Sequence, residues 1–263
     1  MRLVVCTAEG GNPFDGVFWS SYLEADAPPP EQIILLETKD DQRGRVRTAL
    51  EAALLFRPIE LVRLGSSQVF HRPLHEEDRR RGLHQAPSTL FPTEAILELR
   101  TLNSNRGREV LRSLDPDFLI SVGAPEIFDA NVLDIPRRGA LNVHNGRLPD
   151  YRGRFGTFWE MYAGEAEGWV TIHEMTAEVD SGAVLAEKSV DLEGSLFKAL
   201  MTKKQLGGRL LARLLSQELG GPTGVREQSD SNASYYGWPS LLEMASLRWA
   251  WSANSWLKKE RDR

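Results

Sequence analysis

The chain has 263 residues, of which 41% are hydrophobic and 26% are charged, and these proportions are those of an ordinary globular protein. Its formal charge of −5 argues against a general nucleic-acid-binding protein, because neutralising phosphates requires an excess of lysine and arginine. The single cysteine, Cys6, cannot form an internal disulfide, which favours a reducing cytoplasm. Because the sequence shows neither a signal peptide nor a long apolar run, we expect a cytosolic protein that does not cross a membrane.

The first part of the chain alternates apolar runs with segments of helical composition. A buried strand is expected over 3–7, a helix over 16–25 that stops before the prolines at 28–30, and a second strand over 33–37. A further helix is expected over 43–56. This alternation is typical of the beginning of a parallel α/β sheet.

A glycine-rich loop follows the first predicted strand and contains Gly10, Gly11 and Asn12. Glycines just before a helix let backbone amides approach a phosphate, so these three residues are candidates for binding a phosphorylated substrate. The alternative is a tight turn that requires positive φ angles.

Residues 67–91 form the least regular part of the sequence. His71, His75 and His84 lie here around an acidic and basic run at 76–81. Their spacing lacks the neighbouring ligand and the helix register of a zinc site, so we expect a surface insertion that binds no metal.

Strands and helices follow one another more closely in the second part of the chain. The expected elements are a strand over 96–102, a helix over 106–114, a strand over 118–123, strands that begin at Gly139 and Gly168, a strand over 182–190 and a helix over 195–218. Strands and helices of this length predict an α/β fold with a doubly wound, mostly parallel sheet, whose ligand crevice lies at the carboxyl ends of the strands. Gly123 and Asn142 should both lie at that edge.

Polar side chains follow the short apolar strand that begins at Gly139. Because successive side chains of a strand point to opposite faces, Asn142 and His144 should project the same way while Val143 turns into the protein. An amide donates hydrogen bonds, and an imidazole can donate, accept or carry a proton near neutral pH. Together they can bind the oxygen of a carbonyl under attack, which favours acyl transfer. The alternative is a pair of polar residues that satisfies the end of a strand.

Four motifs in a fixed order make this pattern specific. They are Asn142-Val-His144, Leu148-Pro-Asp-Tyr-Arg-Gly153, Val170-Thr-Ile-His173 and Val179-Asp-Ser-Gly182. This series resembles the signature of the folate-dependent formyltransferase family, strongly over 95–200 and loosely elsewhere. The family includes methionyl-tRNA formyltransferase, glycinamide ribonucleotide transformylase, the nucleotide-sugar N-formyltransferases and 10-formyltetrahydrofolate deformylase. The resemblance implies a Rossmann-like formyltransferase fold and 10-formyltetrahydrofolate as co-substrate, with no metal.

The resemblance also implies roles for individual residues. Asn142 and a protonated His144 would hold the oxyanion that forms when an amine attacks the formyl carbon, and Asp180 would support the imidazolium and relay the amine's proton. His173 matches a histidine of some family branches, but a satisfied strand histidine is the favoured interpretation. The folate slot is implied at Ala124, Pro125, Glu126, Ile127, Phe128, Ala177, Glu178 and Val179.

Three further expectations concern the loop after the catalytic strand and the identity of the acceptor. Arg152 and Arg154 either meet a substrate phosphate or face solvent, and Leu148–Pro149 matches a peptide bond that is cis in some relatives. The favoured function is formyl transfer to a small amine, the amino group of a nucleotide-linked sugar. The alternatives are hydrolysis of the formyl-folate, formylation of an amino acid derivative, glycinamide ribonucleotide or methionyl-tRNA, and a non-catalytic folate or nucleotide binder.

The last forty residues change in character. We expect a catalytic domain over 1–221 and an appendage over 222–263 that holds four of the seven tryptophans: Trp238, Trp249, Trp251 and Trp256. Methionyl-tRNA formyltransferases carry a larger C-terminal domain than this segment could form. So much apolar surface is not left in solvent. We favour a homodimer contact over packing back on the same domain, and stacking of a nucleotide base on one of these rings is a third alternative.

Overall fold

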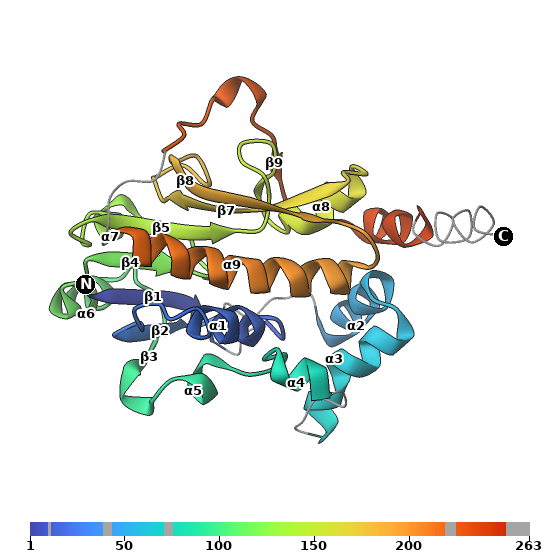
Figure 1. Cartoon of the computed structure of the whole chain (residues 1–263), viewed down its shortest axis with the longest axis horizontal. Helices are drawn as coiled ribbons and strands as arrows, with labels where there is room; N and C mark the ends of the chain where they lie inside the picture. The colour runs from blue at the N-terminus through green and yellow to red at the C-terminus, as the bar shows by residue number, and fades with distance from the viewer. Residues whose placement is uncertain (10–11, 39–43, 71–75, 219–224, 251–263) are drawn as a thin grey trace.

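A seven-stranded sheet forms the centre of the molecule in the computed structural model, which describes residues 1–9, 12–38, 44–70, 76–218 and 225–250 (Figure 1). The strand order is β3-β2-β1-β4-β5-β7-β8. The strands are β1 (Leu3–Ala8), β2 (Gln32–Leu36), β3 (Ile96–Leu99), β4 (Phe118–Ser121), β5 (Gly139–His144), β7 (Glu167–Glu174) and β8 (Val184–Asp191). β1 to β5 pair in parallel, whereas β7 pairs antiparallel with both β5 and β8. The predicted mostly parallel, doubly wound sheet is confirmed.

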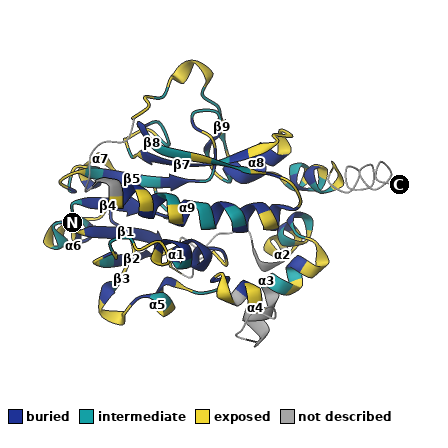
Figure 2. Cartoon of the chain, in the orientation of Figure 1, coloured by how far each residue is buried: buried dark blue, intermediate teal, exposed yellow. Residues whose placement is uncertain are grey.

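Helices cover both faces of the sheet. They are α1 (Asp15–Leu23), α2 (Gly44–Leu55), α3 (Pro58–Phe70), α4 (Glu76–Arg80), α5 (Pro87–Leu90), α6 (Asn105–Leu114), α7 (Ala130–Leu133), α8 (Gly156–Tyr162) and α9 (Leu196–Glu218). α1 and α9 pack on one face, where Phe18 and Leu211 meet Val5 of β1. α6 and α7 pack on the other face, where Leu111 meets Val4. β1 is therefore buried on both sides, as its unbroken apolar sequence predicts (Figure 2).

The region 67–91 is more ordered than its sequence suggests. It contains the end of α3, all of α4 and α5, and a fully buried Leu83. Arg63 of α3 pairs with the buried Asp78, and the His84 imidazole contacts the Arg63 carbonyl oxygen at 3.0 Å. Outside 71–75 this part of the chain is thus more regular than expected, because local polarity did not reveal its packing, and its interpretation as a surface insertion stays a prediction. His71 and His75 lie outside the described residues.

Residues 225–250 pack against the α/β domain. The short strand β9 (Tyr235–Tyr236) pairs in parallel with β6 (Arg152–Gly153), and Met244 and Leu247 are buried in the same core cluster as residues of α8 and α9. These side chains thus pack back on the domain that precedes them, which was the less favoured alternative for the segment. Leu242 and Trp249 are 81% and 78% exposed, so a homodimer contact stays a prediction. Trp251 and Trp256 lie outside the described residues.

Within the described ranges, none of the helices combines the length and the apolar character that crossing a lipid bilayer requires. The peptide bond Leu148–Pro149 is cis, as the sequence motif predicts.

Candidate active site

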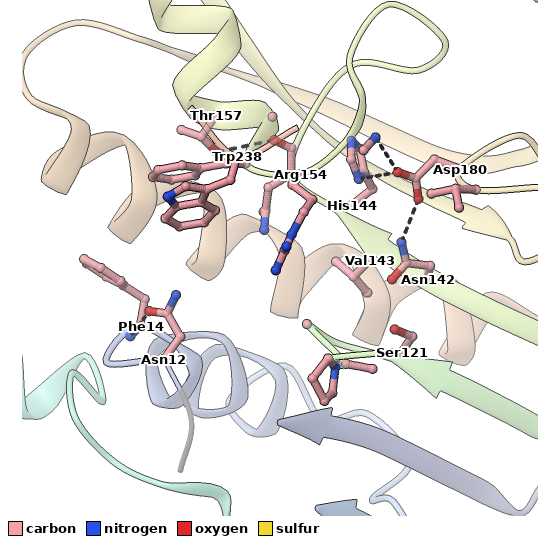
Figure 3. Close-up of a pocket in the computed structure, with 18 of the residues that line it drawn as sticks. Asn12, Phe14, Ser121, Asn142, Val143, His144, Arg154, Thr157, Asp180 and Trp238 are labelled. Carbon is pink, nitrogen blue, oxygen red and sulfur yellow. Dashed lines mark hydrogen bonds and ion pairs between the residues drawn. The ribbon is translucent and has the colours of Figure 1, made fainter. Parts of the chain in front are cut away.

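A cavity of about 810 Å³ opens at the carboxyl ends of the central parallel strands (Figure 3). Asn12 reaches it from the loop after β1, Ser121 and Gly123 from the end of β4, and Asn142 and His144 from β5. The strand order of the sheet explains why residues so far apart in sequence meet here. The predicted position of Gly123 and Asn142 at this edge is confirmed.

Strand register lines up the polar side chains of the cavity. Asn142 is the pairing partner of Ser121 on β4 and of His173 on β7, and residues paired across neighbouring strands share a face of the sheet. His144 lies two residues further along β5 and projects the same way. Ser121, Asn142, His144 and His173 all line the cavity.

Asp180 lies at the centre of this cluster. Its Oδ2 accepts a hydrogen bond from the Gly153 backbone N–H at 2.8 Å and lies 3.5 Å from His144 Nδ1. Its Oδ1 accepts from Asn142 Nδ2 at 3.3 Å and lies 3.3 Å from His173 Nε2. The structure therefore brings the three predicted catalytic side chains into mutual contact. Figure 3 shows Asp180 between His144 and Asn142.

The Asn142 amide keeps one N–H available for a ligand. Asn142 Nδ2, His173 Nε2 and Asp180 Oδ1 form a nearly equilateral triangle with sides of 3.1, 3.3 and 3.3 Å. The two partners thus subtend an angle at Nδ2 that is much smaller than the angle between its two N–H bonds. A single N–H directed between them can serve both partners, which leaves the other for an oxygen in the cavity.

His173 belongs to this cluster. Sequence reasoning favoured a satisfied strand histidine and did not predict its contacts with Asn142 and Asp180. Its Nδ1 lies 2.7 Å from the Glu174 carbonyl oxygen, and the ring is 1% exposed, as expected for a satisfied strand histidine. A carbonyl oxygen only accepts, so Nδ1 carries a proton. The seven-residue spacing was the signal for the contact with Asp180.

The His144 ring is oriented by the carbonyl group of Tyr151. His144 Nε2 lies 2.7 Å from that oxygen, so Nε2 carries the proton and Nδ1 faces Asp180. Gly146 permits this approach, because a Cβ atom at that position would lie 2.8 Å from His144 Nε2 and 3.1 Å from the Tyr151 oxygen. Nδ1 is therefore the nitrogen that can exchange a proton in the site.

Burial sets the charge of the two central groups. Burial lowers the pKa of the His144 imidazole, although the Asp180 carboxylate opposes this shift. Burial alone would raise the pKa of the Asp180 carboxyl, but the imidazoles of His144 and His173 and the Gly153 amide hold that pKa well below its usual range. The free site thus pairs an ionised Asp180 with a neutral His144, whereas the resemblance implies a protonated His144.

This charge state predicts how stability depends on pH. The folded-state pKa of His144 is lower than its value in the unfolded chain, about 6.5, so the unfolded state binds more protons. The stabilisation is complete above about pH 6.5 and is lost as the pH falls through the folded-state pKa. We expect urea-unfolding free energies of a His144→Gln variant to decline less than those of the wild type between about pH 7 and pH 5. Equal declines would contradict a buried, neutral His144.

A buried ion pair fixes the backbone that follows His144, and sequence reasoning missed it. Lys203 of α9 pairs with Glu160 of α8, and both side chains are fully buried. Lys203 Nζ also donates to the Asn145 carbonyl oxygen at 3.2 Å, and Glu160 Oε1 accepts from the backbone N–H groups of Arg147 and Trp169, each at 3.0 Å. Buried charges persist when paired and hydrogen-bonded in this way. The ion pair thus holds the backbone of residues 145 and 147 in place next to the cavity.

One side of the cavity corresponds to the predicted folate slot. Ala177 does not line the cavity. The other seven of the eight residues predicted for the slot do: Ala124, Pro125, Glu126, Ile127, Phe128, Glu178 and Val179. Phe128 is buried, whereas the Glu126 carboxylate accepts a hydrogen bond from the Leu102 backbone N–H at 2.8 Å. The slot therefore combines apolar side chains with a fixed polar rim.

Another part of the lining comes from residues 12–14, which precede α1, from α2, from residues 153–157 and from the segment after residue 225. Asn12 and Arg154 line the cavity, as predicted for substrate-binding residues, but Arg152 does not. Arg152 is 8% exposed and donates to Gln228 and Asp230, so its predicted position in the cavity is wrong. Gly10 and Gly11 lie outside the described residues.

Aromatic residues complete this part of the lining: Trp238, one of the tryptophans noted in the sequence, and Phe14 and Phe155, which the sequence did not single out. Trp238 stacks on Phe155 with ring centroids 4.9 Å apart and stays 38% exposed, and Phe14 faces Trp238 across the cavity (Figure 3). The Arg154 guanidinium carbon lies 5.9 Å from the Trp238 ring centroid. A flat apolar surface and a cation thus lie together near the catalytic cluster.

Known proteins resemble this chain in sequence and in fold. A methionyl-tRNA formyltransferase of Clostridium perfringens is 30% identical over 199 residues, which cover 72% of this chain and 63% of that protein. The chain thus spans less than two thirds of the length of this relative.

Two solved structures share the fold. A sugar N-formyltransferase from Shewanella sp FDAARGOS_354 is 14% identical with a TM-score of 0.54, over 90% of this chain and 77% of that one. An N-formyltransferase from Helicobacter canadensis, in complex with folinic acid and dTDP-3-aminofucose, is 14% identical with a TM-score of 0.51, over 90% and 70%. The family model described as formyl transferase matches residues 66–205, more than half of the chain, and the protein therefore belongs to the formyl transferase family.

Proposed function

We propose that this protein transfers the formyl group of 10-formyltetrahydrofolate to a primary amine of a small substrate, the amino group of a nucleotide-linked sugar. One observation carries the proposal. Asn142, His144 and Asp180 lie together on the wall of a single cavity that is also lined by residues 124–128, proposed for the folate, and by the aromatic residues Phe14, Phe155 and Trp238. Two ligands could meet there with the formyl carbon next to the catalytic cluster.

The geometry supports a direct transfer. The amine nitrogen attacks the formyl carbon, and the carbonyl oxygen becomes an oxyanion that the free Asn142 N–H stabilises. His144 Nδ1 takes a proton from the attacking nitrogen, and the Asp180 carboxylate, 3.5 Å away, stabilises the imidazolium that forms. When the intermediate collapses, the bond from carbon to the folate nitrogen breaks and the imidazolium returns its proton to that nitrogen. The products are a formamide and tetrahydrofolate.

The second side of the cavity supports a nucleotide-linked acceptor. Trp238 presents a partly exposed ring on which a base can stack, and the Arg154 guanidinium is positioned for a phosphate oxygen. The Helicobacter canadensis neighbour, whose structure contains a nucleotide-linked amino sugar, is consistent with this acceptor class. The formal charge of −5 disfavours a tRNA acceptor.

An acceptor screen tests the proposal. The purified protein is incubated with 10-formyltetrahydrofolate and, separately, nucleotide-linked amino sugars, the free amino sugars, glycinamide ribonucleotide and methionyl-tRNA. We expect tetrahydrofolate release that depends on a nucleotide-linked amine, and a formylated product by mass spectrometry. Equal release without any amine would indicate hydrolysis instead. Release only with methionyl-tRNA or glycinamide ribonucleotide would refute the sugar acceptor but preserve formyl transfer.

A further inference from the structure

The segment that begins at residue 225 reaches the backbone of Asp180 through one side chain. Gln228 Nε2 donates to the carbonyl oxygen of Asp180 at 2.9 Å and to that of Gly182 at 2.6 Å. Both N–H groups of this amide are therefore used on the turn that carries Asp180. That turn needs support, because Asp180 has a φ angle of 54°, which is unfavourable for a residue other than glycine.

The oxygen atom of the Gln228 side-chain amide is also hydrogen-bonded. Its Oε1 accepts from Arg152 Nε at 3.2 Å and from Arg152 Nη2 at 3.0 Å, and Arg152 Nη1 donates to Asp230 Oδ1 at 2.9 Å. Every polar atom of the Gln228 side chain thus has a partner within hydrogen-bonding distance. A half-buried amide with all of its polar atoms hydrogen-bonded has one preferred position.

Residues 152 and 153 hold Asp180 from two directions. The Gly153 backbone N–H donates to the Asp180 carboxylate at 2.8 Å, while the Arg152 side chain acts through Gln228 on the Asp180 carbonyl oxygen. The pairing of β6 with β9 fixes this dipeptide, since Arg152 N donates to the Ser234 carbonyl oxygen at 3.0 Å. The carboxylate and the backbone of one residue are therefore tied to the same short strand.

We propose that Gln228 is a positioning residue that fixes the Asp180 backbone and so directs the Asp180 carboxylate toward His144 and Asn142. The inference rests on the proposed role of Asp180 in formyl transfer. Gln228 lies outside residues 66–205, which the family model matches, so this contact belongs to the chain's own C-terminal segment. The segment thus completes the catalytic centre in addition to lining the acceptor side.

The substitution Gln228→Met keeps the length of the side chain and removes its hydrogen bonds. A displacement of about 1 Å in a catalytic group can cost about 10²-fold in rate, so we expect kcat to fall by tenfold to about a hundredfold. The KM for 10-formyltetrahydrofolate and the affinity for unreactive 5-formyltetrahydrofolate should stay close to wild type, because Gln228 does not line the cavity. Gln85→Met, at a half-buried glutamine that bonds Ser20, is the matched control and should keep wild-type kcat.

A second measurement needs no substrate. The Asp180 carboxylate raises the pKa of His144, so a displaced carboxylate should lower that pKa in an NMR titration of the five histidines. The double variant with Arg152→Met should add little to either effect, because both residues act through one contact. A wild-type kcat and an unchanged His144 titration in Gln228→Met would overturn the positioning role. A shifted His144 titration in a protein that transfers no formyl group would support the positioning role and refute the proposed function.

Discussion

Replacing Asp180 with asparagine should lower kcat for formyl transfer by about 10²–10⁴-fold, the range that general acid–base groups contribute. The change preserves the shape of the side chain but removes its negative charge. The imidazolium that forms when His144 Nδ1 takes the amine's proton then loses the carboxylate 3.5 Å away. Single-turnover rates with saturating 10-formyltetrahydrofolate measure this step directly.

Hydrogen bonding adds to the loss. The carboxylate accepts from the Gly153 N–H on one oxygen and from the Asn142 N–H on the other. The NH₂ group of an asparagine would have to face one of these two donors, so one contact is lost in either orientation. Displacement of Asn142 would then impair the oxyanion site as well.

Asp150→Asn is the matched control for this experiment. Asp150 lies in the loop that precedes β6, and its carboxylate is 3.7 Å from Arg147 in a largely exposed ion pair. Exposed pairs of this kind contribute little, so this variant should keep the wild-type rate. A fully active Asp180→Asn enzyme with a normal melting temperature would show that the reaction does not depend on the Asp180 carboxylate to stabilise the imidazolium.

The second large effect is expected for Asn142→Ala, which removes the free N–H that we assign to the oxyanion. Loss of one such donor costs about 10²–10³-fold in kcat. Because the interaction forms as charge develops on the oxygen, kcat and kcat/KM should fall together while binding of 5-formyltetrahydrofolate changes little.

The control here is Asn232→Ala, at an exposed asparagine that does not line the cavity. It should retain full activity. If Asn142→Ala instead raises KM and spares kcat, Asn142 contributes to ground-state binding and the oxyanion assignment is incorrect.

Local sequence patterns were sufficient for the sheet. The alternation of strand side chains predicts that Asn142 and His144 share a face, whereas their meeting with Asp180 was implied by the resemblance to the formyltransferase family. The partners of this cluster were not predictable in the same way. Lys203 and Gln228 follow Asp180 by more than twenty residues, and nothing near them in sequence indicates which backbone groups they contact.

The position of Arg152 shows how Gly153 interrupts the alternation of side chains along a strand. Two residues separated by one position on a regular strand share a face, and the sequence offered Arg152 and Arg154 the same two alternatives, a substrate phosphate or solvent. Gly153 has a φ angle of 98°, and a Cβ atom there would lie 2.3 Å from the Tyr236 carbonyl oxygen. This backbone conformation ends the alternation, and the two arginines point into different surroundings.

The shared cavity also has a kinetic consequence. Since the residues proposed for folate and for the acceptor line one space together with Asn142, the proposed reaction requires both substrates to be resident before any bond changes. In that reaction the formyl carbon passes directly between two nitrogens without a covalent enzyme intermediate; the sole cysteine, Cys6, is fully buried in the sheet. The proposed reaction therefore follows a sequential rather than a ping-pong scheme, and tetrahydrofolate leaves only after an acceptor has arrived.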